Sequence, residues 1–474
     1  MSQGWNIVVV VADTFRSGYL GAYGNDWVHT PNLDRFAAEG VRFTNAHPEC
    51  LPTIPTRRTL HSGRRAFPFP TYAPVPWDNV YIPGWQPMSA DEPAVAEALA
   101  RGGCHTGFFA DVPHYFVPGM NFTRGFRQWE FVRGQAEDRY RAAARADEAL
   151  VSRYQGNPNR VRAHLVNVQP HRPEETWPTA RLFRSAIEFV EQNAGNTPFY
   201  LYVDGFTPHE TWEAPLHYYD LYGRREDREP VLLNLPYRPL DDAAVEARLE
   251  SVKANYAGLV TLVDTWFGKL VATIDRLGLK ESTLVIFLSD HGTNFADNAE
   301  RVTGKPAGYM YPGTMDIPLL VRHPSGANAG TACDELVYTL DVPATVMAAS
   351  RAQAAGEIEG QSLLPLVEGT PGFSPREYLT CRYGNFVWYK DAKSWYFSDV
   401  DFEGPRLFDL EADPECRENI AGRCPDRIAL ARERILADAG GRLPRYEHRG
   451  TDALGRPEYA EQQSQPTQQT GGTA

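Results

Sequence analysis

The residues best suited to chemistry lie in one short run, TIPTRRTLHSGR, which spans residues 53–64. Pro55 presets an early helical φ, so the run is expected to begin a helix whose free backbone N–H groups attract an anion. Thr53 would place a hydroxyl at this helix N-terminus, and Arg57 would add a planar, permanently charged fork for the oxygens of a tetrahedral group. The alternative is an ordinary helix start with a solvated basic face, and the run alone leaves both interpretations open.

Two strongly apolar strands end in side chains that suit a metal ion. The run IVVVV leads to Asp13, and the run LVIFL leads to Asp290 and His291. Such continuous runs are typical of parallel strands buried on both faces, whose carboxyl ends meet where α/β proteins bind ligands. Two carboxylates, one imidazole and the Thr53 hydroxyl make a mixed O/N set for a divalent cation. For Asp13, capping of the next helix is the alternative.

Strands and helices alternate along most of the chain. Helices are expected at residues 30–40, 94–103 and 259–277, and further strands at residues 41–46, 106–110, 198–203 and 317–321. This alternation predicts an α/β fold with a large, mainly parallel central sheet flanked by helices. The aromatic-rich C-terminal part predicts a small antiparallel sheet plus a helix. We expect a catalytic domain over residues 1–370, this subdomain over 371–445 and a flexible tail over 446–474.

The composition bounds the partners of the protein. The chain has 474 residues, 42% of them hydrophobic, and a net charge of −13, which argues against binding a nucleic-acid polymer. Its six cysteines are scattered without a C-x-x-C pair, as in a reducing compartment. Neither a signal-peptide pattern nor an apolar run of about 18 residues is evident. We therefore expect a cytoplasmic protein without a membrane partner, and a homo-oligomer remains open.

Taken in this order, the motifs resemble the sulfatase family of the alkaline phosphatase superfamily along nearly the whole chain. The matching segments are residues 6–13 (first metal strand), 30–45 (a TPNLD stretch), 53–64 (the nucleophile signature C/S-x-P-S/T-R-x-x-L-x-T/S-G-R), 284–292 (second metal strand) and 406–419 (a C-terminal hairpin). The resemblance implies an alkaline phosphatase-like fold and a hydrolase of phosphoric or sulfuric esters. It also implies one divalent ion held by Asp13, Thr53, Asp290 and His291.

The resemblance assigns roles to the side chains around the nucleophile. Thr53 resembles the nucleophile, and Arg57 the group that offsets the charge of the transferring group. His209, in a P-H element, and Lys305 are expected to protonate or stabilise the leaving oxygen, His209 as a group that titrates near neutrality. His114 is expected to bind substrate. The alternatives are a structural His209, an exposed loop lysine at 305 and no role for His114.

Departures from the sulfatase pattern point toward phosphorus chemistry. Sulfatases convert a Cys or Ser at the nucleophile position to formylglycine, which Thr53 cannot form, so no formylglycine is expected. A register that begins at Cys50 also reads C-x-P, but it would put Ile54 in the place of the arginine. The paired aspartates after the first strand are here Asp13 and Thr14, and the lysine of a G-K-W-H element is missing from the run ADVPH. This outline resembles the phosphonate monoester and phosphodiester hydrolases of the superfamily.

The sequence therefore predicts a metal-dependent hydrolase of phosphate or phosphonate esters, including phosphodiesters, with a covalent Thr53 intermediate. A formylglycine-independent sulfatase or a transferase is the alternative, and a non-catalytic anion-binding relative is the third reading. His291 favours Mn²⁺ or Zn²⁺, with Ca²⁺ and Mg²⁺ left open. A second ion would need Asp204 and His209, whose spacing differs from two-metal relatives, so we expect one ion. The substrate is expected to be a small anionic ester, and no motif identifies its alcohol.

Overall fold

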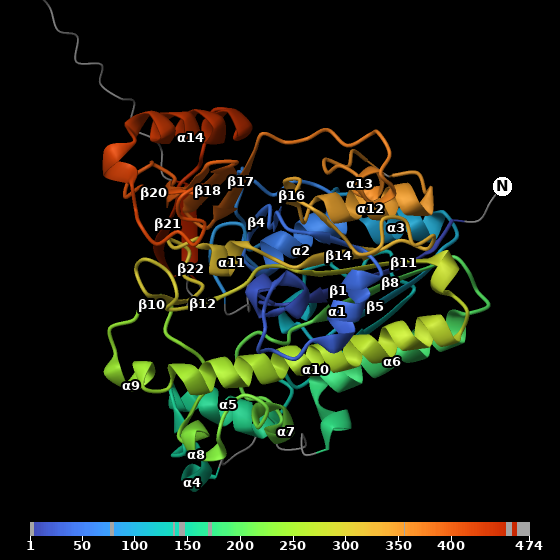
Figure 1. Cartoon of the computed structure of the whole chain (residues 1–474), viewed down its shortest axis with the longest axis horizontal. Helices are drawn as coiled ribbons and strands as arrows, with labels where there is room; N and C mark the ends of the chain where they lie inside the picture. Colours follow the sequence, from blue (N-terminus) through green and yellow to red (C-terminus); the bar gives the residue numbers. More distant parts are fainter. Residues whose placement is uncertain are drawn as a thin grey trace, which may run out of the picture.

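The computed structural model describes residues 4–75, 80–135, 138–141, 147–168, 173–354, 356–451 and 457–461. Its centre is an eight-stranded sheet with the order β15-β2-β14-β11-β1-β8-β5-β6 (Figure 1). The strands are β1 (Asn6–Ala12), β2 (Val41–Phe43), β5 (His105–Ala110), β6 (Gln128–Phe131), β8 (Phe199–Gly205), β11 (Thr283–Ser289), β14 (Leu319–Arg322) and β15 (Thr331–Cys333). Only β14 runs antiparallel to its neighbours, β11 and β2. The predicted α/β fold with a mainly parallel sheet is confirmed.

The alternation of side chains along β1 divides the core into two layers. Val8 and Val10 face a cluster that includes α1 (Pro31–Ala38), α6 (Pro178–Asn193) and α10 (Leu249–Arg276). Ile7 and Val9 face the opposite cluster, which includes α2 (Thr53–Ser62), α3 (Val95–Arg101) and α12 (Asp341–Ser350). Figure 1 shows these helices on the two sides of the sheet. Because both faces are covered, every residue of β1 and β11 is buried, as their apolar runs predict.

The long helix α10 differs from the sequence prediction at its start. It begins at Leu249 rather than at residue 259, because Val252 and Tyr256 pack into the same buried layer. Among the described residues, it is the one helix long and apolar enough to cross a membrane. However, 83% of its most apolar window is buried inside the protein, as in a core helix.

The C-terminal part forms the predicted antiparallel sheet and helix. β17 (Tyr378–Tyr383), β18 (Phe386–Asp391), β19 (Ser394–Asp399) and β20 (Arg406–Asp409) pair in sequence, and α14 (Pro425–Asp438) packs on β18 and β19. The short strand β4 (Cys50–Leu51), which lies directly before Thr53, pairs in parallel with β17. The C-terminal sheet therefore supports the chain that leads into α2, a connection between the two predicted domains that the sequence did not indicate.

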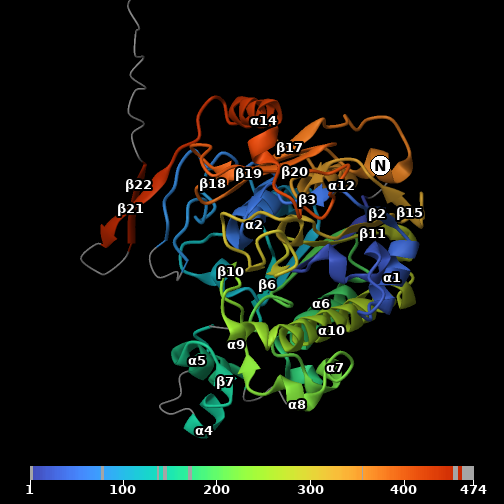
Figure 2. The ribbon, with the colours of Figure 1, turned by 60° about the vertical axis from the view of Figure 1, so that its left-hand side comes forward.

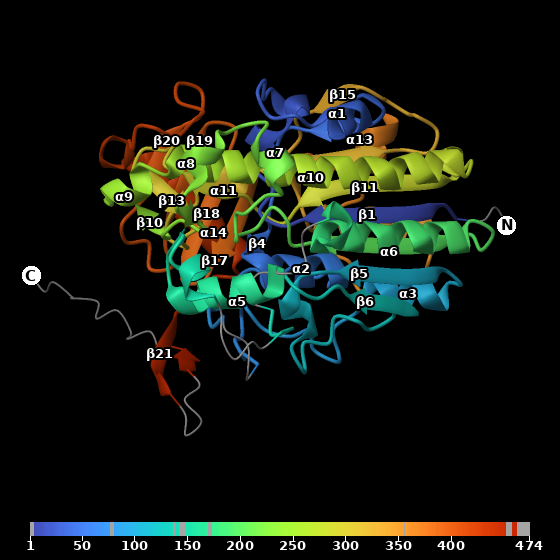
Figure 3. The ribbon, with the colours of Figure 1, turned by 90° about the horizontal axis from the view of Figure 1, so that it is seen from below.

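The segment expected as a flexible tail contains one described hairpin. It consists of β21 (Tyr446–Thr451) and β22 (Pro457–Glu461), and Figures 2 and 3 show it projecting from the rest of the chain. The other residues of the predicted tail lie outside the described ones. The division into three domains stays a prediction.

Shorter elements complete the described structure. They are β3 (Ala46–His47), β7 (Tyr154–Gln155), β9 (Val231–Leu232), β10 (Arg238–Pro239), β12 (Asn294–Phe295), β13 (Val302–Gly304), β16 (Val337–Tyr338), α4 (Glu148–Val151), α5 (Pro158–Val168), α7 (Leu216–Tyr219), α8 (Arg225–Arg228), α9 (Ala243–Glu246), α11 (Pro312–Met315) and α13 (Leu364–Glu368).

Candidate active site and metal centre

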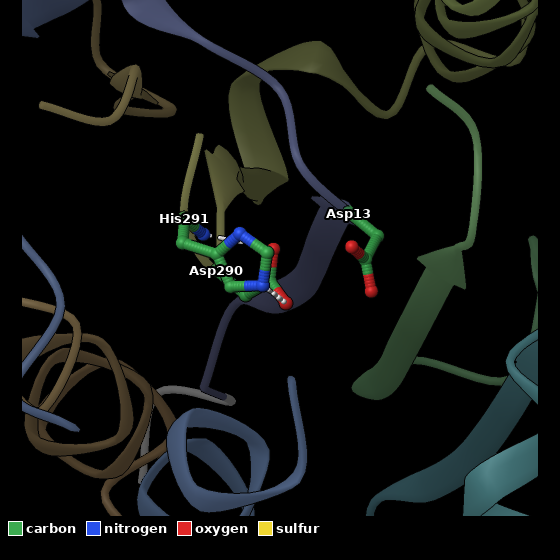
Figure 4. A group of neighbouring side chains, drawn as sticks. All are labelled: Asp13, Asp290 and His291. Atoms are coloured by element: carbon green, nitrogen blue, oxygen red, sulfur yellow. Dashed lines mark hydrogen bonds and ion pairs between the residues drawn. The ribbon is translucent and has the colours of Figure 1, made fainter. Parts of the chain in front are cut away.

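Three of the predicted metal ligands meet at the carboxyl edge of the central sheet (Figure 4). Asp13 directly follows β1, and Asp290 and His291 directly follow β11, the parallel neighbour of β1. The register between the two strands pairs their last residues, so the residues that follow lie beside each other. One ligand atom from each of the three side chains lies within 4.8 Å of the other two, and all three side chains are buried.

The donor atoms of this cluster fit a divalent cation. His291 Nδ1 lies 3.0 Å from the carbonyl oxygen of Gly292, so Nδ1 carries the proton and Nε2 presents a lone pair. A backbone carbonyl commonly orients a metal-binding imidazole in this way. His291 Nε2 and Asp13 Oδ2 are buried and make no hydrogen bond, although Arg57 Nη2 is within ion-pair range of Asp13 Oδ2 at 3.0 Å. A cation would satisfy both atoms.

The protonation of the three ligands also suits a cation. Burial acts against ionisation of Asp290, but His291 and Arg57 lower the pKa of its carboxyl to about 2. Burial and the neighbouring charge of Asp290 raise the pKa of Asp13 above its usual value. Burial lowers the pKa of His291, which keeps the imidazole neutral. A bound divalent charge would favour the ionised form of Asp13.

Arg57 lies in a cage of three carboxylates, and its Nη1 donates a hydrogen bond to the carbonyl oxygen of Thr53 at 3.3 Å. Its guanidinium bonds Asp204 twice, Nε at 3.0 Å and Nη2 at 2.6 Å, and also forms ion pairs with Asp13 and Asp290. Arg57 and the three aspartates are all fully buried. The guanidinium therefore acts first on the carboxylates, and its predicted contact with the transferring group stays a prediction. The sequence could not show this cage, because nothing marks Asp204 as a partner of Arg57.

A cavity of about 820 Å³ lies in front of α2 and collects four of the predicted residues. Thr53, the first residue of α2, lines this cavity together with His114, His209 and Lys305. Cys50, the nucleophile of the rejected register, lies in β4, is fully buried and is not among the lining residues. Burial raises the pKa of its thiol well above the usual value, as for an inert core cysteine. Ligation of a metal by Thr53 stays a prediction.

His209 lies on the cavity wall, but its environment contradicts the expectation that it titrates near neutrality. Its ring stacks on Phe206 with the centroids 4.0 Å apart, and Nδ1 lies 2.6 Å from the carbonyl oxygen of Glu210. Burial and the nearby charge of Lys305 lower the pKa of His209 to about 3. The imidazole is therefore neutral at pH 7, with its proton on Nδ1 and a lone pair on Nε2. The neutral imidazole presents Nε2 as a proton acceptor, and the role of His209 at the leaving oxygen stays a prediction.

Glu210 organises this side of the cavity and was missed in the sequence. Its Oε2 accepts a hydrogen bond from Lys305 Nζ at 2.9 Å, and its Oε1 accepts one from the Tyr237 hydroxyl at 2.8 Å. Lys305 and His209 hold the pKa of Glu210 well below its usual range despite burial. Lys305 is only 4% exposed, so it is not a solvated loop lysine. The available signal was the position of Glu210 directly after His209.

Thr14 connects this group to the metal cluster. Its hydroxyl donates to Asp13 Oδ1 at 2.7 Å and accepts a hydrogen bond from Lys305 Nζ at 2.8 Å. The φ of Thr14 is 61°, a left-handed value that is unfavourable for a β-branched residue and that tends to occur at functional sites. The residue that replaces the second aspartate of the sulfatase pattern therefore joins Lys305 to a predicted metal ligand.

A family model named Sulfatase matches residues 5–351, and one for the C-terminal part of N-sulphoglucosamine sulphohydrolase matches residues 307–427. The chain belongs to the sulfatase family. Members of this family are ester hydrolases that bind a divalent metal ion, and the cluster of Asp13, Asp290 and His291 is the candidate site for it in this sulfatase-family chain.

Individual relatives of this sulfatase-family enzyme cover it almost from end to end. An arylsulfatase from Clostridium perfringens is 25% identical over 93% of this chain and 95% of its own length. The multifunctional alkaline phosphatase superfamily protein PehA from Trinickia caryophylli is 25% identical over 90% and 93%. The solved phosphonate monoester hydrolase of Agrobacterium radiobacter is 20% identical, with a TM-score of 0.69 over 92% of this chain and 96% of its own. The shared fold confirms the alkaline phosphatase-like architecture.

Asp204, the residue considered for a second metal, belongs to the arginine cage of this sulfatase-family site. Besides Arg57, it accepts a hydrogen bond from the Tyr115 hydroxyl at 2.5 Å. Burial raises the pKa of Asp204 to about 6, against the lowering effect of Arg57. The structure does not bring Asp204 and His209 into a metal-ligand cluster among the described residues. The number of ions stays a prediction.

Replacing Glu210 with glutamine is expected to lower kcat by roughly ten- to a hundredfold, the usual effect of losing a group that orients a catalytic side chain. The amide keeps the shape but removes the charge that pairs with Lys305 at 2.9 Å. Lys305 would lose its ion pair and keep at most neutral hydrogen-bond partners, among them Thr14. The measurement is kcat and KM over a range of pH, with Glu213→Gln as the control, because Glu213 bonds His164 and Tyr154 away from Lys305. Equal profiles for Glu210→Gln and the unmodified enzyme would contradict this role.

The free energy of unfolding is expected to depend on pH through Asp111. It accepts hydrogen bonds from Gln135 Nε2 at 2.7 Å and from the Phe206 N–H at 2.5 Å, and burial raises its pKa to about 7. Because the folded state favours the protonated form, its contribution is fully present below the ordinary value of 3.8 and is lost as pH rises through about 7.

Asp111→Asn should therefore lose less stability between pH 5 and pH 8 than the unmodified chain, since each unit of pKa shift corresponds to about 1.4 kcal/mol. Urea unfolding at the two pH values measures this difference. Asp26→Asn, at an exposed position, is the control. An unchanged pH dependence in Asp111→Asn would exclude this carboxyl as the source.

Proposed function

We propose that this chain hydrolyses phosphate or phosphonate mono- and diesters and that Thr53 forms a covalent ester with the transferred group. The observation that carries the proposal is the position of Thr53. It is the first residue of α2 and lines the cavity, and its carbonyl oxygen accepts a hydrogen bond at 3.3 Å from Nη1 of Arg57, which forms ion pairs with Asp13 and Asp290. A threonine hydroxyl cannot become formylglycine, but it can act directly as a nucleophile.

The first step forms a bond between Thr53 Oγ1 and phosphorus and breaks the bond from phosphorus to the alcohol oxygen. The N-terminus of α2 offers backbone N–H groups and a partial positive charge for the non-bridging oxygens. A divalent ion held by Asp13, Asp290 and His291 would supply Lewis-acid charge that makes the Thr53 hydroxyl a better nucleophile. Mn²⁺ and Zn²⁺ suit this mixed carboxylate and imidazole set.

Lys305 and His209 divide the proton transfers. Lys305, held by Glu210 and Thr14, donates a proton to the leaving alcohol oxygen. In the second step the oxygen of water bonds to phosphorus, the bond from phosphorus to Thr53 Oγ1 breaks, and the neutral His209 offers Nε2 as the acceptor of the proton of that water. The proton that leaves the Thr53 hydroxyl in the first step and the proton taken from water return, through solvent, to Thr53 Oγ1 and to the Lys305 amine, so that the enzyme is restored. This assignment replaces the expectation that His209 acts as the acid.

The charges of the cavity support an anionic substrate. Four cationic side chains line it, from Arg133, Arg139, Arg160 and Lys305, against two carboxylates, from Asp138 and Glu210. The excess is positive, although the chain as a whole carries −13. A cavity of one sign with low-dielectric walls concentrates an oppositely charged substrate.

Turnover of 4-nitrophenyl esters with added Mn²⁺, Zn²⁺, Mg²⁺ or Ca²⁺ tests the proposal. The phosphate monoester, the bis-phosphate, the phenylphosphonate and the sulfate share one alcohol, so differences in kcat/KM report on the transferred group. We expect one of the phosphorus esters to be fastest, with Mn²⁺ or Zn²⁺. Fastest cleavage of the sulfate would support a formylglycine-independent sulfatase instead. Absence of turnover with all four esters would support a non-catalytic anion-binding relative.

A further inference from the structure

The greater part of the cavity wall beyond the catalytic groups is apolar. It comes from segments far apart in the sequence and includes Val80, Ile82, Trp85, Phe116, Phe131 and Leu235. Next to Thr53, such a wall is where the alcohol part of an ester must lie while the acid part faces the nucleophile. Its chemistry therefore reports on the alcohol.

Aromatic rings on this wall are held in place by contacts with other rings. The rings of Phe116 and Phe131 stack with centroids 4.4 Å apart and an interplanar angle of 11°. Trp85 contacts His114 edge to face at 4.8 Å. Rings held by one another lose little conformational freedom when a ligand binds, and offset stacking favours a further flat ring.

Many polar side chains of the wall already have hydrogen-bond partners within the protein. Glu210 bonds Lys305 and Tyr237, and Arg133 bonds Asp138 through two hydrogen bonds of 2.8 Å. The Tyr383 hydroxyl donates to the carbonyl oxygen of Lys305 at 2.9 Å, and the Thr211 hydroxyl lies 3.0 Å from Nδ1 of His164. A carbohydrate would bring many hydroxyls into this cavity and would find few side chains in the described wall without a bonded partner. Hydroxyls that lose water without gaining partners weaken binding.

We infer that the alcohol released by this enzyme is an apolar aromatic one, of the size of a substituted phenol or a naphthol, and not a carbohydrate. The inference rests on the proposed ester hydrolysis at Thr53. The exposed Arg139 and Arg160 also line the cavity, where they attract the anionic ester before its ring packs against Phe116 and Phe131.

The kinetic test uses two phosphonate esters whose alcohols have nearly equal acidity, phenol and 2-naphthol, so that reactivity is matched and apolar surface differs. We expect kcat/KM to be roughly tenfold higher for the naphthyl ester, in line with the effect of added apolar contact on specificity. In Phe116→Ala and Phe131→Ala this ratio should fall toward one. Trp27→Ala, which removes an exposed aromatic ring outside the cavity wall, should keep it. A ratio that Phe116→Ala and Phe131→Ala leave unchanged would overturn the inference.

A binding test separates this inference from the proposed chemistry. Calorimetry measures binding of 2-naphthol and of N-acetylglucosamine to the full chain, whether or not any ester is turned over. We expect 2-naphthol to bind more tightly than the sugar, and Phe131→Ala to weaken its binding severalfold. If esters fail to turn over but 2-naphthol binds in this way, the proposed reaction is wrong and the apolar site stands. Tighter binding of the sugar would overturn the inference.

Discussion

Replacing Thr53 with alanine is expected to reduce kcat by roughly 10⁴-fold or more, the order of magnitude found when an enzyme loses its nucleophile. The reason is that Thr53 Oγ1 is the proposed attacking atom. Of the residues at the start of α2, Pro52 and Thr53 line the cavity, and proline has no hydroxyl that could replace that of Thr53. The change removes few packing atoms from a side chain at the cavity surface. Melting temperature and secondary structure should therefore stay close to those of the unmodified enzyme. Steady-state turnover of the best ester measures the effect.

Two control variants distinguish loss of the Thr53 hydroxyl from changes at neighbouring residues. Thr56→Val removes a hydroxyl that is one turn away and fully buried, where it donates to the carbonyl oxygen of Cys50 at 2.6 Å. It should cost about 1 kcal/mol of stability and little of kcat. Cys50→Ala tests the rejected register and should leave kcat nearly unchanged. If Thr53→Ala keeps its activity and Cys50→Ala loses it, the nucleophile signature begins at Cys50 and not at Thr53.

Removal of the metal is expected to abolish turnover and to lower the melting temperature. The three aspartates around Arg57 leave an excess of negative charge in a fully buried site, and a divalent cation would compensate it. A ligand present at a hundred times its Kd stabilises the folded state by about 2.7 kcal/mol. Treatment with EDTA should therefore shift the thermal transition as well as stop the reaction.

Adding single metal ions back to the chelated enzyme identifies the ion, and variants of the cluster identify the site. Mn²⁺ or Zn²⁺ should return both activity and melting temperature to the chelated enzyme. Asp290→Asn, which removes a charge from the cluster, should gain neither when the ion is added. Asp34→Asn alters a carboxylate that bonds Thr30 and Ala22 outside the cluster, and it should respond as the unmodified enzyme does. Activity that is indifferent to EDTA would contradict the metal assignment.

The metal cluster could be predicted from the sequence because two local patterns are sufficient for it. Asp13 and Asp290 each follow a continuous apolar strand, and neighbouring parallel strands bring their carboxyl ends together. The start of α2 at Thr53 follows from its proline and from the family signature in the same way. The parallel pairing of β4 with β17, the first strand of the C-terminal sheet, had no such signal, since β4 has only two residues.

The environment of the predicted side chains could not be predicted. The cage of Arg57 depends on Asp204, which lies 147 residues away. The pKa of His209 was expected near neutrality, but its ring packs against Phe206, and burial, which the sequence does not show, lowers that pKa. The apolar wall of the cavity could not be predicted either, because it depends on residues that are far apart in the sequence. Trp85, Phe116 and Leu235 come from three separate segments without a common motif.

Mass spectrometry of the quenched enzyme detects the proposed covalent ester on Thr53. The enzyme is mixed with excess phosphonate or phosphate ester and the reaction is stopped by acid during steady turnover. Peptides that contain residue 53 are then compared with those from enzyme without substrate. We expect a phosphonyl or phosphoryl group on Thr53 that appears only with substrate. The same group on another side chain, or unmodified Thr53 during rapid turnover with a burst of released alcohol, would contradict this expectation.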